Sequence, residues 1–107
     1  MYAIAFDFDT EMLERLYPNP SWRNAHADVR DYLLENGFEH RQGSVYFGEP
    51  HVTAVDCVAV VQDMASEFSW FTPAIRDIRM LRIEENNDLM VALDRSRRRG
   101  GRGAAAF

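Results

Sequence analysis

Two carboxylates end an alternating stretch near the start of the chain. In IAFDFDTEM (residues 4–12), Asp7 and Asp9 follow a pattern in which bulky apolar residues alternate with smaller ones. A strand points alternate side chains to opposite faces, so both carboxylates share the face that carries Ala3 and Ala5. Carboxylates at such a position activate water by acid/base catalysis or hold a divalent ion, and both chemistries serve phosphoester hydrolysis. The pattern therefore predicts a strand that ends in a candidate catalytic site.

Asp9 has a second interpretation. It stands at the end of the predicted strand, immediately before a helical region, and Asp is a preferred helix N-cap. Asp9 therefore either supports the chemistry of Asp7 or caps the helix that follows, and the sequence leaves both roles open.

The next segments predict two helices and a hairpin. The first helical region is interrupted by Pro18 and Pro20, and Ser21 is placed to cap the helix that resumes after them. FEHRQ and SVYFG flank Gly43 and form a predicted hairpin. A second long helix begins after Thr53, and IRMLRIEE supplies the last strand. The element type of residues 86–93 stays undetermined.

This order, β-α-β-β-α-β, predicts an α+β fold of the ferredoxin-like kind, with a four-stranded antiparallel sheet and two helices on one face. The other sheet face then carries Ala3 and Ala5. Because exposed apolar strand surface usually marks an interface, we expect a face-to-face homodimer. Two-fold symmetry would bring Asp7 of one copy towards Asp7 of the other.

Further polar candidates lie on the hairpin and the last strand. Ser44 and Tyr46 share one hairpin face, which we expect to be the open one, where they contact substrate or line the interface. Arg79 and Arg82 fall on opposite faces of the last strand, so at most one points at the dimer face. Each arginine either contacts phosphate or forms a surface ion pair.

Composition indicates one domain, residues 1–93, followed by a disordered Arg/Gly-rich tail, residues 94–107. Residues 1–93 hold seven arginines against sixteen acidic residues, a net charge near −9, whereas the tail holds five arginines against one, near +4. The tail either holds RNA loosely or is a solvated extension. Neither a signal peptide nor a long apolar run is evident, so we expect a cytoplasmic protein with no membrane partner. The single cysteine, Cys57, cannot form an intrachain disulfide.

Two families begin with an apolar strand and D-x-D. DFDT resembles the start of the haloacid-dehalogenase phosphohydrolases, but 107 residues are too few for their sheet and later motifs. MYAIAFDFDTEML, YPNPSW, GFEHRQGSVYFG and IRDIRMLRIEENNDLM, in this order, resemble the virulence-associated protein D (VapD) family. That family is similar in fold to the CRISPR-associated Cas-two nucleases, which are ferredoxin-like homodimers with an aspartate ending the first strand.

The resemblance implies an endoribonuclease, often the toxin of a toxin-antitoxin pair, with Asp7 as the catalytic carboxylate, RNA as substrate and an antitoxin protein as partner. Two Asp7 side chains facing across a dimer axis would hold one divalent cation such as Mg²⁺, or share the roles of base and acid. The alternative is a non-catalytic ferredoxin-like dimer that binds a partner protein or ligand, because a fold does not fix a function.

Overall fold

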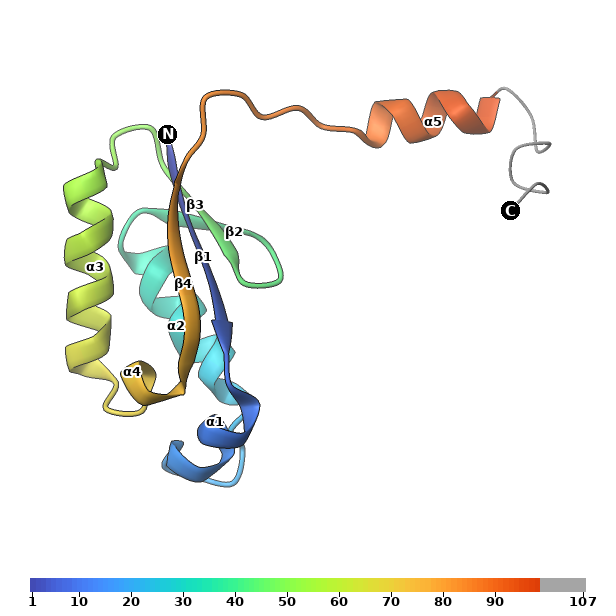
Figure 1. Cartoon of the computed structure of the whole chain (residues 1–107). Coiled ribbons are helices and arrows are strands. Elements are labelled where there is room, and N and C mark those ends of the chain that lie inside the picture. Colours follow the sequence, from blue (N-terminus) through green and yellow to red (C-terminus); the bar gives the residue numbers. More distant parts are fainter. Residues whose placement is uncertain (99–107) are drawn as a thin grey trace.

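The computed structural model describes residues 1–98 and contains one antiparallel sheet with helices on one side of it (Figure 1). The strand order is β2-β3-β1-β4, which confirms the predicted α+β, ferredoxin-like arrangement. The elements in chain order are β1 (Tyr2–Phe8), α1 (Thr10–Leu16), α2 (Asn24–Glu35), β2 (Phe38–Gln42), β3 (Val45–Gly48), α3 (Ala54–Glu67), α4 (Phe71–Ala74), β4 (Ile75–Arg82) and α5 (Met90–Arg98).

The long helices α2 and α3 cover one face of the sheet and enclose the core (Figure 1). The bulky residues of β1 (Ile4, Phe6 and Phe8) are buried in the same core cluster as Leu33 of α2 and Met64 of α3. The two-residue alternation therefore predicted correctly which side of β1 is the core side.

Local sequence signals set the starts of α1 and α3, but not that of α2. Thr53 and Asp56 form a capping box at the start of α3, as Thr53 predicted. Tyr17, just after α1, donates a 2.6 Å hydrogen bond to Asp28 of α2, which ties the two helices across the proline-containing turn. The prediction that Ser21 caps the second helix is wrong, because α2 begins at Asn24 and its N-cap residue is Arg23.

The sheet face that points away from the helices is here called the open face. It consists of Ala3, Ala5 and Asp7 and of the residues of the other strands whose pairing puts them on the same side. Directly opposed residues of an antiparallel pair point to the same side. The open face therefore contains Ala3, Ala5 and Asp7 of β1, Val45 and Phe47 of β3, Asp77, Arg79 and Leu81 of β4, and Glu39 and Gln42 of β2.

Exposed apolar surface on the open face comes from residues other than the expected ones. Ala3 is 0% exposed, because it lies between the larger side chains of Phe47 and Leu81, whereas Leu81 is 45% exposed. The alanines thus form the floor of the face rather than its exposed apolar surface. Its apolar end lies at Ala3, and its charged end lies at Asp7.

Beyond β4 the chain forms an arm, residues 83–98, that leaves the sheet. The backbone N–H of Ile83 donates to the carbonyl of Met1 at 2.8 Å, and the chain then runs without regular structure to α5. α5 continues past Leu93 to Arg98, so the predicted domain boundary after Leu93 falls inside a helix. Residues 99–107 of the expected disordered tail lie outside the described residues. Within residues 1–98, no helix is long and apolar enough to cross a membrane.

Candidate active site at the end of β1

Asp7 lies one residue before the end of β1, on the charged end of the open face. Its side chain is 63% exposed, whereas the neighbours Phe6 and Phe8 are buried on the helix side. Burial of the two phenylalanines fixes the strand's orientation, and the alternation then directs the carboxylate to the opposite side. Asp7 is thus held at a defined position yet remains accessible to a substrate.

A β-bulge brings an arginine to Asp7. Phe8 pairs with Ile75 and Asp7 pairs with Asp77, so Arg76 is the extra residue between the two pairs. Bulges redirect side chains and recur beside active sites. Here the Nη1 atom of Arg76 lies 3.6 Å from Oδ2 of Asp7. The result is an exposed carboxylate with a guanidinium beside it.

A second carboxylate and a second guanidinium complete the charged end. Asp77 stands directly opposite Asp7 across the β1–β4 pair. Nε of Arg79 donates to both oxygens of Asp77 at 3.1 Å, and this hydrogen bonding raises the pKa of Arg79 above its ordinary value. Two like charges directly opposed on a sheet repel each other, and the two arginines offset that repulsion.

One chain does not offer a fitting divalent-ion site at this position. Among residues 1–98, no group of three or more His, Cys, Asp or Glu side chains is arranged to hold a metal ion. Asp7 and Asp77 are each paired with an arginine. A metal cation would therefore have to displace the arginine or bind beside its positive charge. Within residues 1–98, this end of the face thus holds two arginine-paired carboxylates and no ready-made set of three protein ligands for a metal.

The structure assigns a capping role to Asp9. Its Oδ1 accepts hydrogen bonds from the backbone N–H groups of Glu11 at 3.1 Å and Met12 at 3.2 Å, at the N-terminus of α1. The capping role is confirmed, and a part for Asp9 in chemistry stays a prediction.

Replacing Asp9 with alanine should lower the free energy of unfolding by about 1 kcal/mol, the usual loss for an N-cap. The rate of single-turnover RNA cleavage at saturating enzyme should be retained, because the Asp9 carboxylate is committed to α1. Chemical denaturation and a cleavage assay measure the two effects. Asp9→Asn keeps a capping oxygen and serves as the control; a loss of cleavage in both variants would show that Asp9 acts in the chemical step.

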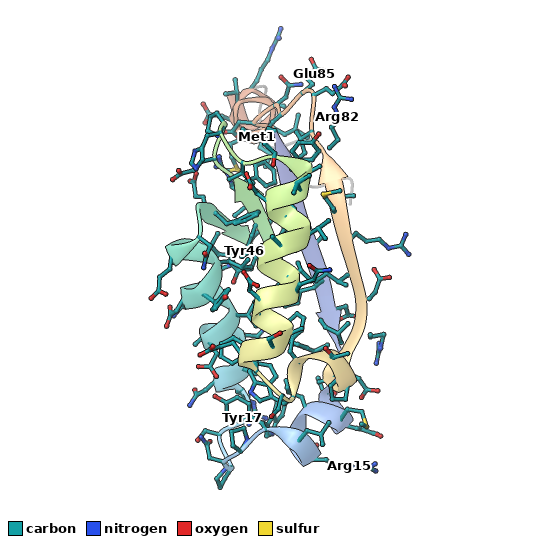
Figure 2. All side chains as sticks on the ribbon, turned by 90° about the vertical axis from the view of Figure 1, so that its left-hand side faces the viewer. Met1, Arg15, Tyr17, Tyr46, Arg82 and Glu85 are labelled. Carbon is teal, nitrogen blue, oxygen red and sulfur yellow. The ribbon has the colours of Figure 1, made fainter. Side chains whose placement is uncertain are left out.

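The expected placement of Tyr46 on the open face is wrong, whereas a substrate or interface contact by Ser44 stays a prediction. Tyr46 pairs with Ile4, so it points to the helix side, where it is 3% exposed and stacks on Phe6. Figure 2, which looks onto the helical layer, shows Tyr46 on that side. Burial raises the pKa of Tyr46, which keeps its phenol protonated. Ser44 lies in the turn, and its carbonyl accepts a 3.1 Å hydrogen bond from the backbone N–H of Phe6.

Arg79 and Arg82 do lie on opposite faces of β4, and both form surface ion pairs. Arg79 pairs with Asp77, whereas Nη2 of Arg82 lies 3.2 Å from Glu84. Arg82 stands opposite Tyr2, at the far end of β1 from Asp7, and Figure 2 shows it near Met1. Only Arg79 is placed near the candidate site; phosphate contact by either residue stays a prediction.

Sequence reasoning missed Arg76 and Asp77. Both lie in the block IRDIRM, directly before the predicted start of the last strand at Ile78. The strand begins at Ile75 instead. The close spacing of charged residues, Arg76, Asp77 and Arg79, was a signal, but it could not reveal which of them stands beside Asp7.

Known proteins that resemble this chain carry one name. No protein-family model matches the chain. "Endoribonuclease VapD 2" of Riemerella anatipestifer is 48% identical over 93 residues, which cover 87% of this chain and 99% of that protein. "Endoribonuclease VapD homolog" of Helicobacter pylori is 46% identical over 93 residues, 87% of this chain and 96% of that protein. The chain belongs to the VapD family. "Endoribonuclease VapD" of Dichelobacter nodosus is 35% identical over 88 residues, which cover 82% of this chain and 91% of that protein. The VapD resemblance predicted from the sequence blocks is thus confirmed over most of the chain.

Proposed function

We propose that this VapD family member is an endoribonuclease and that Asp7 carries the cleavage of RNA. The observation that supports the proposal most is the pair formed by Asp7 and Arg76, exposed together at the charged end of the open face. The names of three relatives, each aligned over more than four-fifths of this chain, support the same activity.

The pair suits phosphodiester hydrolysis without any step through a metal. Asp7 accepts a proton from the attacking water as the new O–P bond forms and the P–O bond to the leaving nucleoside breaks. Arg76 donates hydrogen bonds to the phosphate oxygens on which negative charge develops. The leaving oxygen takes a proton from a second acid, and in the homodimer we propose for this protein that acid is Asp7 of the other copy, at the dimer axis.

The biological setting is part of the same proposal. A cytoplasmic RNA-cleaving protein of this size fits the toxin of a toxin-antitoxin pair, with an antitoxin protein as its partner. The net charge near −9 of residues 1–93 would repel RNA, so substrate approach would depend on the local arginines at the active site and in the tail.

Incubation of the purified protein with end-labelled RNA tests the function and the route together. Cleavage should continue in EDTA, because the carboxylates of one chain are already paired with arginines. Loss of cleavage in EDTA and recovery with Mg²⁺ would instead support a divalent-ion site that includes Asp7. Absence of cleavage under both conditions, with RNA or another ligand bound intact, would favour the non-catalytic dimer.

A further inference from the structure

β4 forms one border of the sheet, and Figure 2 shows it at the right-hand border of the ribbon, alongside α3. Within residues 1–98 only β1 pairs with it. β4 has eight residues, contains no proline and is bulged only near its start. The opposite border strand, β2, has five residues, and its register shifts between His40 and Gln42. Short strands, bulges and proline protect sheet edges from pairing, so β2 is protected whereas β4 presents a long, regular edge.

The register of β4 on β1 shows which of its backbone groups face outward. The N–H of Ile83 donates to the carbonyl of Met1 at 2.8 Å, so these two residues form a hydrogen-bonded pair. Along an antiparallel ladder such pairs alternate with pairs whose backbone groups point away from each other. The residues of β4 with outward N–H and C=O groups are therefore Ile78, Met80 and Arg82. A second extended polypeptide strand matches this spacing with its own donors and acceptors.

An apolar hollow lies beside this edge, on the helix side of the sheet. Its volume is about 200 Å³, and α3 and β4 line it together, mainly through Cys57, Val58, Val61, Ile78 and Met80. Val58 is 50% exposed and Met80 is 46% exposed, so the hollow is reached from solvent. Sites for whole small molecules usually measure about 300–1,000 Å³. The hollow is therefore suited to one large apolar side chain.

We propose that the edge of β4 binds an extended segment of another protein, which adds a fifth strand to the sheet and places an apolar side chain in the hollow. The residue of that segment opposite Met80 forms a hydrogen-bonded pair with it, and directly opposed residues point to the same side. Its side chain therefore lies over the hollow. The backbone bonds supply affinity, and the hollow selects an apolar residue. The site is separate from Asp7, which lies on the open face.

Charge indicates the chemistry of the segment. β4 carries three arginines and one aspartate, although residues 1–93 have a net charge near −9. Arg82 pairs only with exposed Glu84, and such surface pairs contribute about 0–1 kcal/mol, so an acidic residue opposite Arg82 would be favoured. Two β4 strands paired with each other would instead oppose like net charges. RNA would match the arginines but has no array of amides for the edge and no aliphatic group for the hollow.

Residue-resolved amide hydrogen exchange of the full chain tests whether the edge is unpaired. The amides of Arg79 and Leu81, which face β1, should be protected, whereas those of Ile78 and Met80 should exchange rapidly. Equal protection of all four in the protein alone would mean that another segment or a second copy already covers the edge, and it would overturn the proposal.

The binding probe is the end-blocked peptide Thr-Glu-Thr-Leu-Thr-Val-Thr, whose glutamate, leucine and valine stand opposite Arg82, Met80 and Ile78 in antiparallel pairing. It should bind with a dissociation constant below about 1 mM and slow exchange of the outward amides. N-methylation of the leucine removes an N–H that faces β4 and should weaken binding about tenfold or more. N-methylation of the following threonine, whose N–H faces solvent, is the matched control. No saturable binding, or equal effects of the two methyl groups, would refute edge pairing.

Val58→Glu tests the hollow, because it places a charge where the apolar side chain of the peptide would lie. The dissociation constant of the peptide should rise about tenfold or more. Val55→Glu is the control, since Val55 is on the same helix, 77% exposed, and does not line the hollow. Equal affinities for the two variants, or protection of the outward amides by RNA but not by the peptide, would contradict the proposal. RNA cleavage is measured in parallel and should be unchanged in Val58→Glu, so the edge site and the nuclease fail independently.

Discussion

Asp7→Asn is expected to slow single-turnover cleavage of RNA by about 10²- to 10⁴-fold, the usual contribution of a positioned acid or base. Asparagine is nearly isosteric but cannot accept the proton of the attacking water. The fold should be unchanged, because the Asp7 side chain is 63% exposed and its pair with Arg76 lies at the surface, where such pairs contribute about 0–1 kcal/mol. Gel analysis of end-labelled RNA at saturating enzyme measures the rate.

Asp31→Asn is the matched control for this substitution. Asp31 is also an exposed aspartate beside an arginine, since its Oδ1 lies 3.4 Å from Arg30, but it is on α2 in the helical layer. Its replacement should leave the rate within about twofold, as expected for a surface change away from the site. Full activity in a clean, dimeric Asp7→Asn preparation would refute the assignment of Asp7.

Mixed dimers extend the same experiment to the geometry of the site. If both Asp7 side chains serve one site at the dimer axis, one mutant subunit should disable the whole dimer. Independent sites would leave about half of the activity, by simple additivity. Differently tagged wild-type and Asp7→Asn chains, co-expressed and purified through both tags, separate the two results.

Arg76→Gln is expected to lower the cleavage rate about 10²-fold, comparable to the loss of one donor that stabilises transition-state charge. Glutamine is polar but shorter, and it carries no charge to oppose the charge that develops on phosphate. The loss should appear mainly in kcat rather than KM, because the interaction strengthens in the transition state. Arg76→Lys should recover part of the rate, since it restores the charge without the planar pair of donors.

Arg30→Gln provides the comparison for Arg76, because Arg30 forms the corresponding exposed pair with Asp31 on α2. Its rate should match that of the wild type. If Arg76 only balanced the charge of Asp7, then Arg76→Gln would change the pH profile or the unfolding free energy and leave kcat intact. That result would remove Arg76 from the chemistry and leave Asp7 in place.

The sequence by itself determined the order of the four strands and the two long helices, and the position of Asp7. Alternation in β1 depends on neighbouring residues only: the bulky apolar side chains must reach the core, and Asp7 must then point away from it. The prolines that separate α1 from α2 and the capping signals at Asp9 and Thr53 are also local, because each acts within one helical turn.

Only the tertiary structure decided which other residues share the face with Asp7. The hairpin alternates in sequence, but its register against β1 selects which set faces the helices, and a shift of one residue exchanges the two. The register buries the aromatic ring of Tyr46 on the helix side and places Val45 and Phe47 on the open face, so Tyr46 lies away from the site of Asp7. A bulge in the pairing of β1 with β4, two segments far apart in the chain, places Arg76 beside Asp7. The apolar residues of the arm remain exposed within residues 1–98. These features arise from pairing between distant segments, so the periodicity of any one segment cannot specify them.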